Sequence, residues 1–346
     1  LVFIMKNYIF FTIVFLITAL LYLHLKSQLH VLDTCSDIPY IDSELTREQF
    51  HTLCSKKSPF VYKYGVSEDE KIFEKEYLVS NDKHFEVNTC IPEKMSTSNT
   101  DTDETQTTSN TSSSHMNRIN IDTLFSPDAV SHTGFDNGEF LKETGKYDIL
   151  YRNDSFMRPN FTASFNYDMI VSQRCYNKEV NEKTPMAFQN KYYTHVIHCI
   201  ENPIHFKLVL PKFSDFFVKT GTTTTNTDLF SNIDLFDEDS IKNDKHLSKL
   251  KVYDIVLQSG DAIYIPPFWI YAYTPFNIKM DMIMNSDNTD ETGTENKSNE
   301  DKGVEQCHSI CVEYNYMTYM NAMVFIPNTL QHHSRKVREL SDSYFK

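Results

Sequence analysis

The chain has 346 residues and a formal net charge of −14, which argues against a nucleic-acid partner because phosphates demand a basic face. Apolar residues make up 40% of the chain, enough for a hydrophobic core, and the seven cysteines include no CxxC pair and hence no zinc-finger spacing. Setting aside an apolar N-terminal stretch and two polar tracts leaves roughly 250–270 residues, the size of one large domain.

The N-terminal stretch predicts a membrane anchor. Residues 8–25 carry no charged side chain, which is near the lower limit for a membrane-spanning helix and long for a signal-peptide core. A cleaved signal peptide and a buried helix are the alternatives, but no convincing small-residue cleavage site follows. The short N-terminal tail favours a single-pass protein whose body is lumenal or extracellular, on the secretory pathway. Four Asn-x-Ser/Thr sequons, at Asn110, Asn153, Asn160 and Asn296, are compatible with that location.

Two tracts have the composition of disordered segments. Residues 95–116 and 285–305 are rich in Ser, Thr, Asn and acidic residues and offer almost no side chains that could build a core. We interpret them as insertions into one domain spanning 36–330, because loops tolerate extra length at little cost. Residues 331–346 form a basic tail.

Between these tracts the hydrophobic periodicity is mainly that of β-strands. Strands are predicted at 194–200, 204–211, 251–258, 262–265, 277–284 and 307–316, with the pair 251–258 and 262–265 forming a hairpin-like unit around Ser259, Gly260 and Asp261. Helices are predicted at 42–56, with Ser43 as the N-cap, and at 211–219 and 316–326. Many short strands with peripheral helices indicate a β-barrel or sandwich.

Three phrases then stand in order along the body. They are "IPYIDSELTREQFHTLCSKKSPFVYKYG" at 38–65, "THVIHCIENPIHFKLVLPKFSDFF" at 194–217 and "YDIVLQSGDAIYIPPFWIYAY" at 253–273. Together they resemble the cupin-like JmjC family, whose last phrase carries a Gly-Asp turn, a proline and a tryptophan; here these are Gly260, Asp261, Pro266 and Trp269. The resemblance implies a double-stranded β-helix, and structural roles for these four residues.

The enzymes of this family use Fe(II) and 2-oxoglutarate, and hold the iron with a His-x-Asp/Glu and a distal His. Carried over to this chain, the three ligand positions fall on Gln189, Lys191 and Tyr271, none of which suits Fe(II). None of the three phrases contains a His-x-Asp or His-x-Glu triplet. We therefore expect a degenerate site in which these three side chains converge without a metal, and no cofactor.

The former cofactor pocket could still hold an anion or another ligand. Lys191, His195, Lys207 and Tyr273 are the residues predicted for such a pocket, since family members bind 2-oxoglutarate with a basic residue. The simpler interpretation of the two lysines is ordinary surface exposure. His195 and His198 should point to opposite faces of their strand, which opposes a new metal site built from them.

The sequence thus predicts a membrane-anchored, catalytically inactive JmjC/cupin-like protein that acts as a binding or scaffold module. Its expected partners are a membrane, through the N-terminal helix, and an unidentified protein or small molecule. The alternative is an active Fe(II)/2-oxoglutarate-dependent oxygenase, of the protein hydroxylase or demethylase type, with rearranged metal ligands. The third hypothesis is a protein with a purely structural role that keeps the fold of the family.

Overall fold

The computed structural model describes residues 2–29, 37–90, 116–126, 132–175, 187–217, 219–222, 228–230, 233–243, 245, 247–276 and 306–323. The predicted strand at 277–284, the polar tract 285–305 and the tail 331–346 lie outside the described residues. So does the tract 95–116, apart from Met116, which begins a strand.

The N-terminal half of the body supplies most of the helices. In chain order its elements are α1 (Val2–Leu29), β1 (Tyr40–Ile41), α2 (Arg47–Ser55), β2 (Phe60–Lys63), η1 (Glu68–Phe73), α3 (Lys75–Asn81), β3 (Glu86–Cys90), β4 (Met116–Asn120), α4 (Ile121–Leu124), β5 (His132–Gly134), α5 (Gly138–Glu143) and α6 (Lys146–Asn153). Most of this region carried no prediction, because its helices are short and separated by irregular turns.

The C-terminal half supplies most of the strands. They are β6 (Thr162–Cys175), β7 (Ala187–Gln189), β8 (Thr194–Glu201), β9 (Ile204–Val209), β10 (Lys219–Thr222), β11 (Asp228–Phe230), β12 (Val252–Leu257), β13 (Asp261–Tyr264), β14 (Ile270–Pro275) and β15 (Gln306–Thr318). Between them lie η2 (Pro211–Phe216), α7 (Glu238–Asn243) and η3 (Leu247–Lys249). The described body is therefore mainly β, as the alternation of apolar and polar residues predicted.

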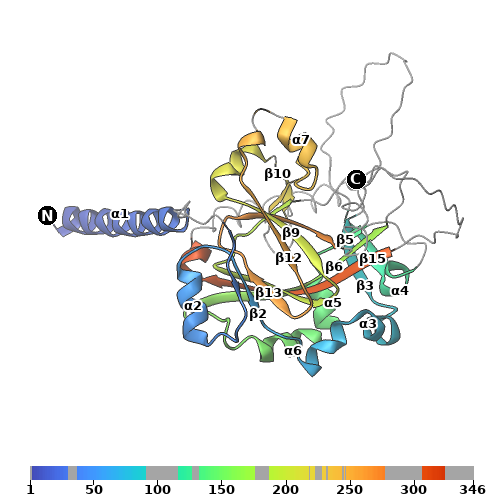
Figure 1. Cartoon of the computed structure of the whole chain (residues 1–346). Helices are drawn as coiled ribbons and strands as arrows, with labels where there is room; N and C mark the ends of the chain where they lie inside the picture. The colour runs from blue at the N-terminus through green and yellow to red at the C-terminus, as the bar shows by residue number, and fades with distance from the viewer. Residues whose placement is uncertain are drawn as a thin grey trace, which may run out of the picture.

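The strands form two sheets (Figure 1). Sheet A has nine strands in the order β1-β2-β13-β8-β15-β6-β5-β3-β4, and sheet B has six in the order β10-β11-β7-β14-β9-β12. Only the β1–β2 pair is parallel among the described pairings. β15 sits between β6 and β8, and it pairs with both along most of its length.

From β6 onward, strands that are neighbours in the sequence mostly lie in different sheets. The hairpin predicted at 251–265 is wrong, because β12 pairs with β9 in sheet B while β13 joins sheet A. The turn between them is held by Gly260, whose φ of 85° suits a residue without a Cβ and whose carbonyl accepts the backbone N–H of Gly65 at 2.8 Å. Asp261 fastens the same turn by accepting the backbone N–H of Gln258 at 3.0 Å. This turn moves the chain from one sheet to the other.

Three helical predictions also need correction. α2 begins at Arg47 and not near Ser43, because Thr46 and Gln49 form a reciprocal capping box that satisfies the first free N–H groups. β15 continues through Thr318, so the predicted helix at 316–326 is a strand at its start; residues 319–323 are helical, and 324–326 lie outside the described residues. The predicted helix at 211–219 is the 3₁₀ segment η2.

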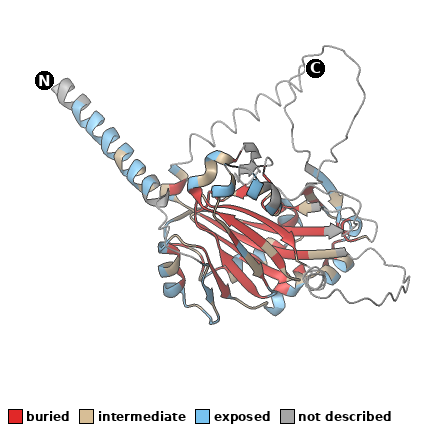
Figure 2. Cartoon of the chain, turned by 45° about the horizontal axis from the view of Figure 1, so that its top comes forward, coloured by how far each residue is buried: buried red, intermediate tan, exposed pale blue. Residues whose placement is uncertain are grey.

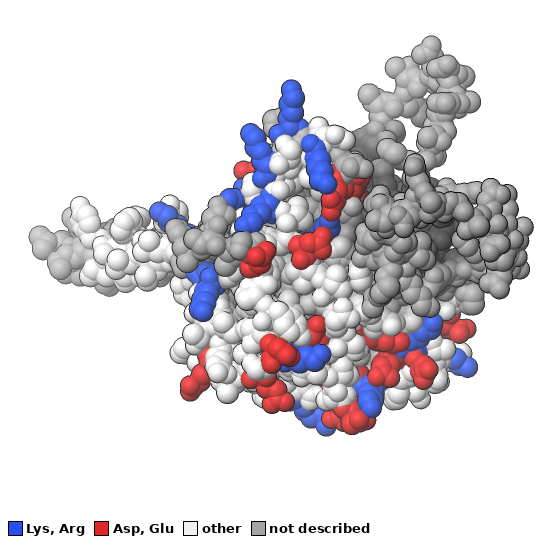
Figure 3. Space-filling view, in the orientation of Figure 1, with Lys and Arg blue, Asp and Glu red and all other residues white. Residues whose placement is uncertain are grey.

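Apolar side chains fill three layers, and the buried residues are concentrated in the strands (Figure 2). One cluster lies between sheet A and the helices, and includes Phe50 and Tyr314. A second lies between the two sheets, and includes Phe206 and Tyr271. A third, including Ile270, lies between the outer face of sheet B and the segment that carries α7. Lys and Arg side chains gather on the surface around α7 (Figure 3).

Helix α1 projects from the body (Figures 1 and 2), and its described side chains are largely exposed. Phe15, for example, is 70% exposed. At the end nearest the body, His24 Nε2 lies 2.7 Å from Asn321 Oδ1. Across the part of the chain that is described, no helix has both the length and the apolarity needed to cross a membrane.

Candidate functional site

Polar side chains line one region of the space between the two sheets. On the inner face of sheet A, His195 of β8 lies opposite Asn315 of β15, and Glu313 of β15 lies opposite Asp168 of β6. Tyr271 of β14 faces them from sheet B, 5.3 Å from the His195 ring. These five residues, which we call the inner polar cluster, are each at most 7% exposed.

A hydrogen-bonded chain joins three members of the cluster. The Asn315 amide nitrogen donates to Glu313 Oε2 at 3.3 Å, so the amide oxygen is free to accept from His195 Nδ1. This arrangement fixes the tautomer with the proton on Nδ1. Burial lowers the pKa of His195 to about 4, so the imidazole is neutral at physiological pH. Its Nε2 has no hydrogen-bond partner among the described residues.

The two facing carboxyl groups have different surroundings. Asp168 accepts the backbone N–H groups of Asp136, Asn137 and Met169 at 2.6, 2.5 and 2.7 Å. Burial, together with the nearby charge of Asp136, still raises the pKa of Asp168 to about 7. For Glu313, burial first and then Asp168 raise the pKa well above its ordinary value.

The pair therefore titrates as a unit. Two buried carboxylates on opposing strand positions repel each other, so a proton on one of them relieves the repulsion. Asp168 already receives three N–H groups that favour its charged form, whereas Glu313 receives one amide bond. The proton therefore resides on Glu313.

An aromatic wall faces the inner polar cluster. Phe188 of β7 stacks with Tyr271 at 5.4 Å and with Tyr273 at 5.3 Å between ring centroids. Phe206 of β9 contacts Tyr273 at 5.6 Å. Burial raises the pKa of Tyr271 well above its ordinary value, so its phenol stays protonated.

The predicted former-ligand positions do not all converge. Gln189 is in register with Ile270, whereas Tyr271 is in register with Phe188. Because successive side chains of a strand alternate between faces, Gln189 lies on the outer face of sheet B and Phe188 on the inner face. The expected convergence is therefore wrong for Gln189. Lys191 is buried in the connection between β7 and β8.

The residues predicted for an anion pocket also lie on different faces of the sheets. His195 and Tyr273 lie on the inner faces, but Lys207 does not join them, since it pairs on the outside of sheet B with Asp254 at 3.2 Å and Glu238 at 3.3 Å. Successive side chains of β9 point to opposite faces of the sheet, so Phe206 faces inward and Lys207 faces outward. The two lysines therefore do not frame one inner pocket.

The opposite orientation predicted for His195 and His198 is confirmed. His198 lies on the helix-covered face of sheet A, where its Nδ1 is 3.6 Å from Glu70 Oε1 and its ring packs edge-on against Tyr64 at 4.6 Å. The two histidines thus belong to different layers of the protein.

Pro266 and Trp269 hold the β13–β14 connection. The Asn190 side chain donates to the carbonyls of Ile265 and Pro266 at 2.7 and 3.0 Å, while its backbone N–H donates to the Trp269 carbonyl. The indole of Trp269 is 2% exposed and packs on Tyr253 at 5.5 Å. These contacts lock β7 to β14 at the edge of the inner polar cluster.

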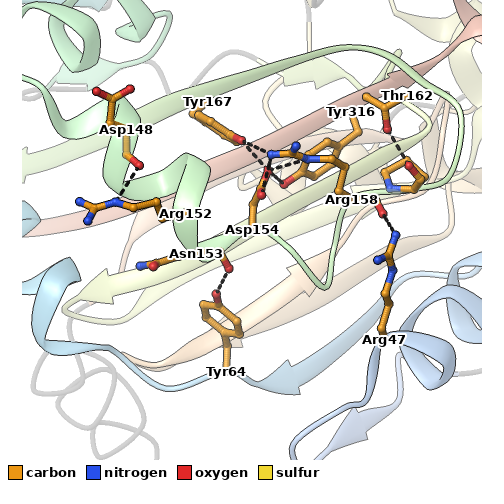
Figure 4. A network of polar contacts seen from close by, with 11 residues as sticks. Arg47, Tyr64, Asp148, Arg152, Asn153, Asp154, Arg158, Thr162, Tyr167 and Tyr316 are labelled. Carbon is orange, nitrogen blue, oxygen red and sulfur yellow. Dashed lines mark hydrogen bonds and ion pairs between the residues drawn. The ribbon is translucent and has the colours of Figure 1, made fainter.

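A second polar network lies in the helical layer (Figure 4). Asp154, 1% exposed, accepts from Arg158 Nη2 and from the hydroxyl groups of Tyr167 and Tyr316. It ties the end of α6 to β6 and β15. Arg158, Tyr167 and Tyr316 all donate to this one carboxylate. The network therefore stabilises the fold, and its side chains are not available for catalysis.

The residues of the inner polar cluster that the sequence did not reveal are Asp168, Glu313 and Asn315. Each occupies an inward position of a strand that otherwise alternates apolar residues. A buried acid in such a pattern is the signal that could have found them.

The donor chemistry of the cluster does not match an Fe(II) site. Phe188 offers no ligand atom, and Tyr271 carries a protonated phenol. In the described ranges, no three His, Cys, Asp or Glu side chains are grouped so that they could hold one metal ion. The cluster offers hydrogen-bonding groups instead: a neutral imidazole, an amide, a protonated carboxyl group and a phenol.

No family model matches the chain, and a comparison with curated proteins finds no match.

Proposed function

We propose that the body is a double-stranded β-helix of the cupin/JmjC type. The support is the strand order: β13-β8-β15-β6 within sheet A and β7-β14-β9-β12 within sheet B. From β6 to β9, and again from β12 to β15, each strand lies in the other sheet from the strand before it. The strands β9 to β12 all lie in sheet B. This winding places the end of β7 beside the start of β14, where the resemblance puts the metal ligands.

On this fold the protein acts as a catalytically inactive binding or scaffold module. The observation that carries the proposal is the stacked pair of Phe188 and Tyr271 at 5.4 Å, which fills the inner-face positions where two ligand histidines would meet. An aromatic pair contributes packing energy and offers no Fe(II) ligand set. The function therefore rests on recognition by the folded surface and the inner polar cluster.

A metal-restoration experiment tests this proposal. The variant Phe188→His/Asn190→Asp/Tyr271→His follows the register of the structure, and a matched control, Gln189→His/Lys191→Asp/Tyr271→His, follows the sequence alignment. Titration with Fe(II) should show binding by the first variant, and weaker or no binding by the control and the wild type. Stoichiometric iron in the purified wild-type protein would refute the proposal.

The rearranged-ligand oxygenase remains a second candidate because His195 Nε2 is available inside the barrel, close to Tyr271. Against it, Asp168 uses both oxygens for backbone N–H groups, and the cluster contains one imidazole. An assay for 2-oxoglutarate turnover with added Fe(II) separates the two: turnover abolished by His195→Ala would establish the oxygenase.

The proposal includes attachment to a membrane through α1. Its support is the uncharged run 8–25 in the sequence and the exposed apolar side chains along the helix. Extraction of membranes with alkaline carbonate tests the attachment, and release of the full-length protein would refute it.

A further inference from the structure

A cavity of about 480 Å³ opens at the end of the body that α1 approaches. Its wall combines α1, α2, the turn before β6 and the end of β15, and includes His24, Cys54, Phe161, Tyr193 and Tyr319. The volume falls within the range of about 300–1,000 Å³ typical of small-molecule sites.

Among the residues that the structure describes, the lining of this cavity contains no Asp, Glu, Lys or Arg. Burial raises the pKa of the Cys54 thiol well above its ordinary value, and burial lowers the pKa of His51, so both side chains stay neutral. Arg47 lies behind this lining, where its guanidinium donates to the Arg158 carbonyl and to the side chain of the lining residue Asn160 at 3.2 and 3.4 Å, so the lining itself presents neutral groups. An apolar chain loses contact with water in such a site without leaving a charge unpaired.

Phe161 stands at the rim of the cavity in an unusual conformation. Its side chain is 83% exposed, and its φ of 59° is rare for a bulky residue. The backbone is held there because the Phe161 carbonyl accepts the N–H of Tyr319 at 3.3 Å. Tyr319 is itself 61% exposed, so two aromatic rings project beside the opening. Strain of this kind is commonly kept at functional sites.

The position of α1 indicates where the ligand comes from. His24, in the last turns of α1, lines the cavity and bonds to Asn321 just after β15. If α1 is inserted in a membrane, as proposed above, the cavity opens at the membrane surface. Exposed aromatic side chains favour that interface because one part of the ring is apolar and the hydroxyl of tyrosine stays hydrated.

We propose that this cavity binds the acyl chain of a lipid taken from the adjacent membrane, with Phe161 and Tyr319 inserted at the interface as its rim. The inference rests on the proposed membrane attachment of α1. It assigns the protein a lipid-binding site that is separate from the inner polar cluster.

Photo-crosslinking tests the proposal on the full-length protein. The protein is reconstituted into phosphatidylcholine vesicles that contain a phosphatidylcholine with a mid-chain diazirine, and labelled peptides are mapped by mass spectrometry. A second arm uses a diazirine fatty acid, to distinguish a phospholipid from a free acid as the source of the chain. The expected result is labelling of cavity residues such as Cys54, Tyr193 or Met320 in addition to α1.

The failures of the two proposals are distinguishable. Labelling confined to α1 would overturn the lipid site while leaving the membrane attachment intact. Absence of labelling on both α1 and the cavity would overturn both. Labelling of the cavity in either arm supports the site and identifies the source of the chain.

Rim variants add a quantitative criterion. Phe161→Ala should reduce cavity labelling about tenfold, because about 1.5–3 kcal/mol accompanies the burial of a phenylalanine side chain. Phe161→Trp should retain labelling. The matched control is Tyr77→Ala, which removes an aromatic ring that is 41% exposed on α3, on the side away from α1 (Figure 1). Equal labelling of Phe161→Ala and Tyr77→Ala would refute the role of the rim.

Discussion

Replacing Glu313 by glutamine should make the protein more stable at alkaline pH. The pKa of Asp168, raised to about 7, lies about three units above the roughly 3.9 of a free aspartate, and one unit corresponds to about 1.4 kcal/mol. A carboxyl group with a raised folded-state pKa binds its proton more tightly in the folded state. Its contribution is therefore complete below the unfolded pKa and is lost as the pH rises through the folded pKa. The wild type should lose up to about 4 kcal/mol between pH 4 and pH 7 from Asp168, and a further amount from Glu313, whose pKa is also raised.

Glutamine keeps the shape of the protonated acid and can still accept from the Asn315 amide. Glu313→Gln removes the titration of Glu313 and its repulsion with Asp168, whereas the effects of burial and Asp136 on Asp168 remain, so the loss should become smaller. We expect the variant to be more stable than the wild type at pH 8, by about 1.4 kcal/mol for each unit by which burial and Asp168 raise the pKa of Glu313, and close to the wild type at pH 4.5. His195, whose pKa is lowered to about 4, destabilises both proteins equally in acid, so the difference between them isolates the pair.

Urea unfolding at several pH values between 4.5 and 8.5 provides the measurement. Asp168→Asn is the matched control, because an amide cannot accept all three backbone N–H groups that the carboxylate receives. It should destabilise the protein by about 1–3 kcal/mol for each acceptor lost, at every pH. If Glu313→Gln shows the wild-type pH slope, or is less stable than the wild type at pH 8, the assignment of the proton to Glu313 is refuted.

Three further outcomes are expected. Asp154→Ala should destabilise the protein by about 3–5 kcal/mol in urea unfolding, since it leaves two buried tyrosine hydroxyls and a guanidinium without their acceptor; a loss under 1 kcal/mol would contradict the network. Lys146→Met should cost a similar amount, because it strands Asp82, now 2.5 Å from the ammonium group; the double variant with Asp82→Leu should recover much of that loss. Removing residues 8–25 should move the protein from the membrane fraction to the soluble fraction, and an unchanged distribution would contradict attachment through α1.

The sequence predicted the strands best where apolar and polar residues alternate. "THVIHCI" and "IHFKLVLP" correspond to β8 and β9 within a residue or two, and "KVYDIVLQ" and "AIYI" correspond to β12 and β13. What it could not predict was the pairing. A Gly-Asp turn is equally compatible with a hairpin and with a crossing between sheets, and only the packing of both sheets decides between them.

The candidate site was predicted in part. Tyr271, Tyr273 and His195 do lie on inner faces, because alternation within one strand is reliable. Gln189 was assigned to the wrong face of its strand. The prediction counted alternate residues from 189 to 195 as if they belonged to one strand, but the connection from β7 to β8 is irregular and interrupts the alternation of side chains. Asp168 and Glu313 lie opposite each other on two paired strands that are far apart in the sequence, and no local sequence pattern predicts that pairing.

The central place of β15 has a consequence for how the chain folds during synthesis. β15 is the last described strand, yet it lies between β6 and β8, and its Asn315 meets His195 120 residues earlier in the chain. The backbone groups that β6 and β8 offer to β15 therefore remain unpaired until the ribosome has released residues beyond 318. Such non-local closure slows folding, and it exposes strand edges that invite association with other chains. The nascent protein therefore has the greatest need of a chaperone just before its final strand emerges.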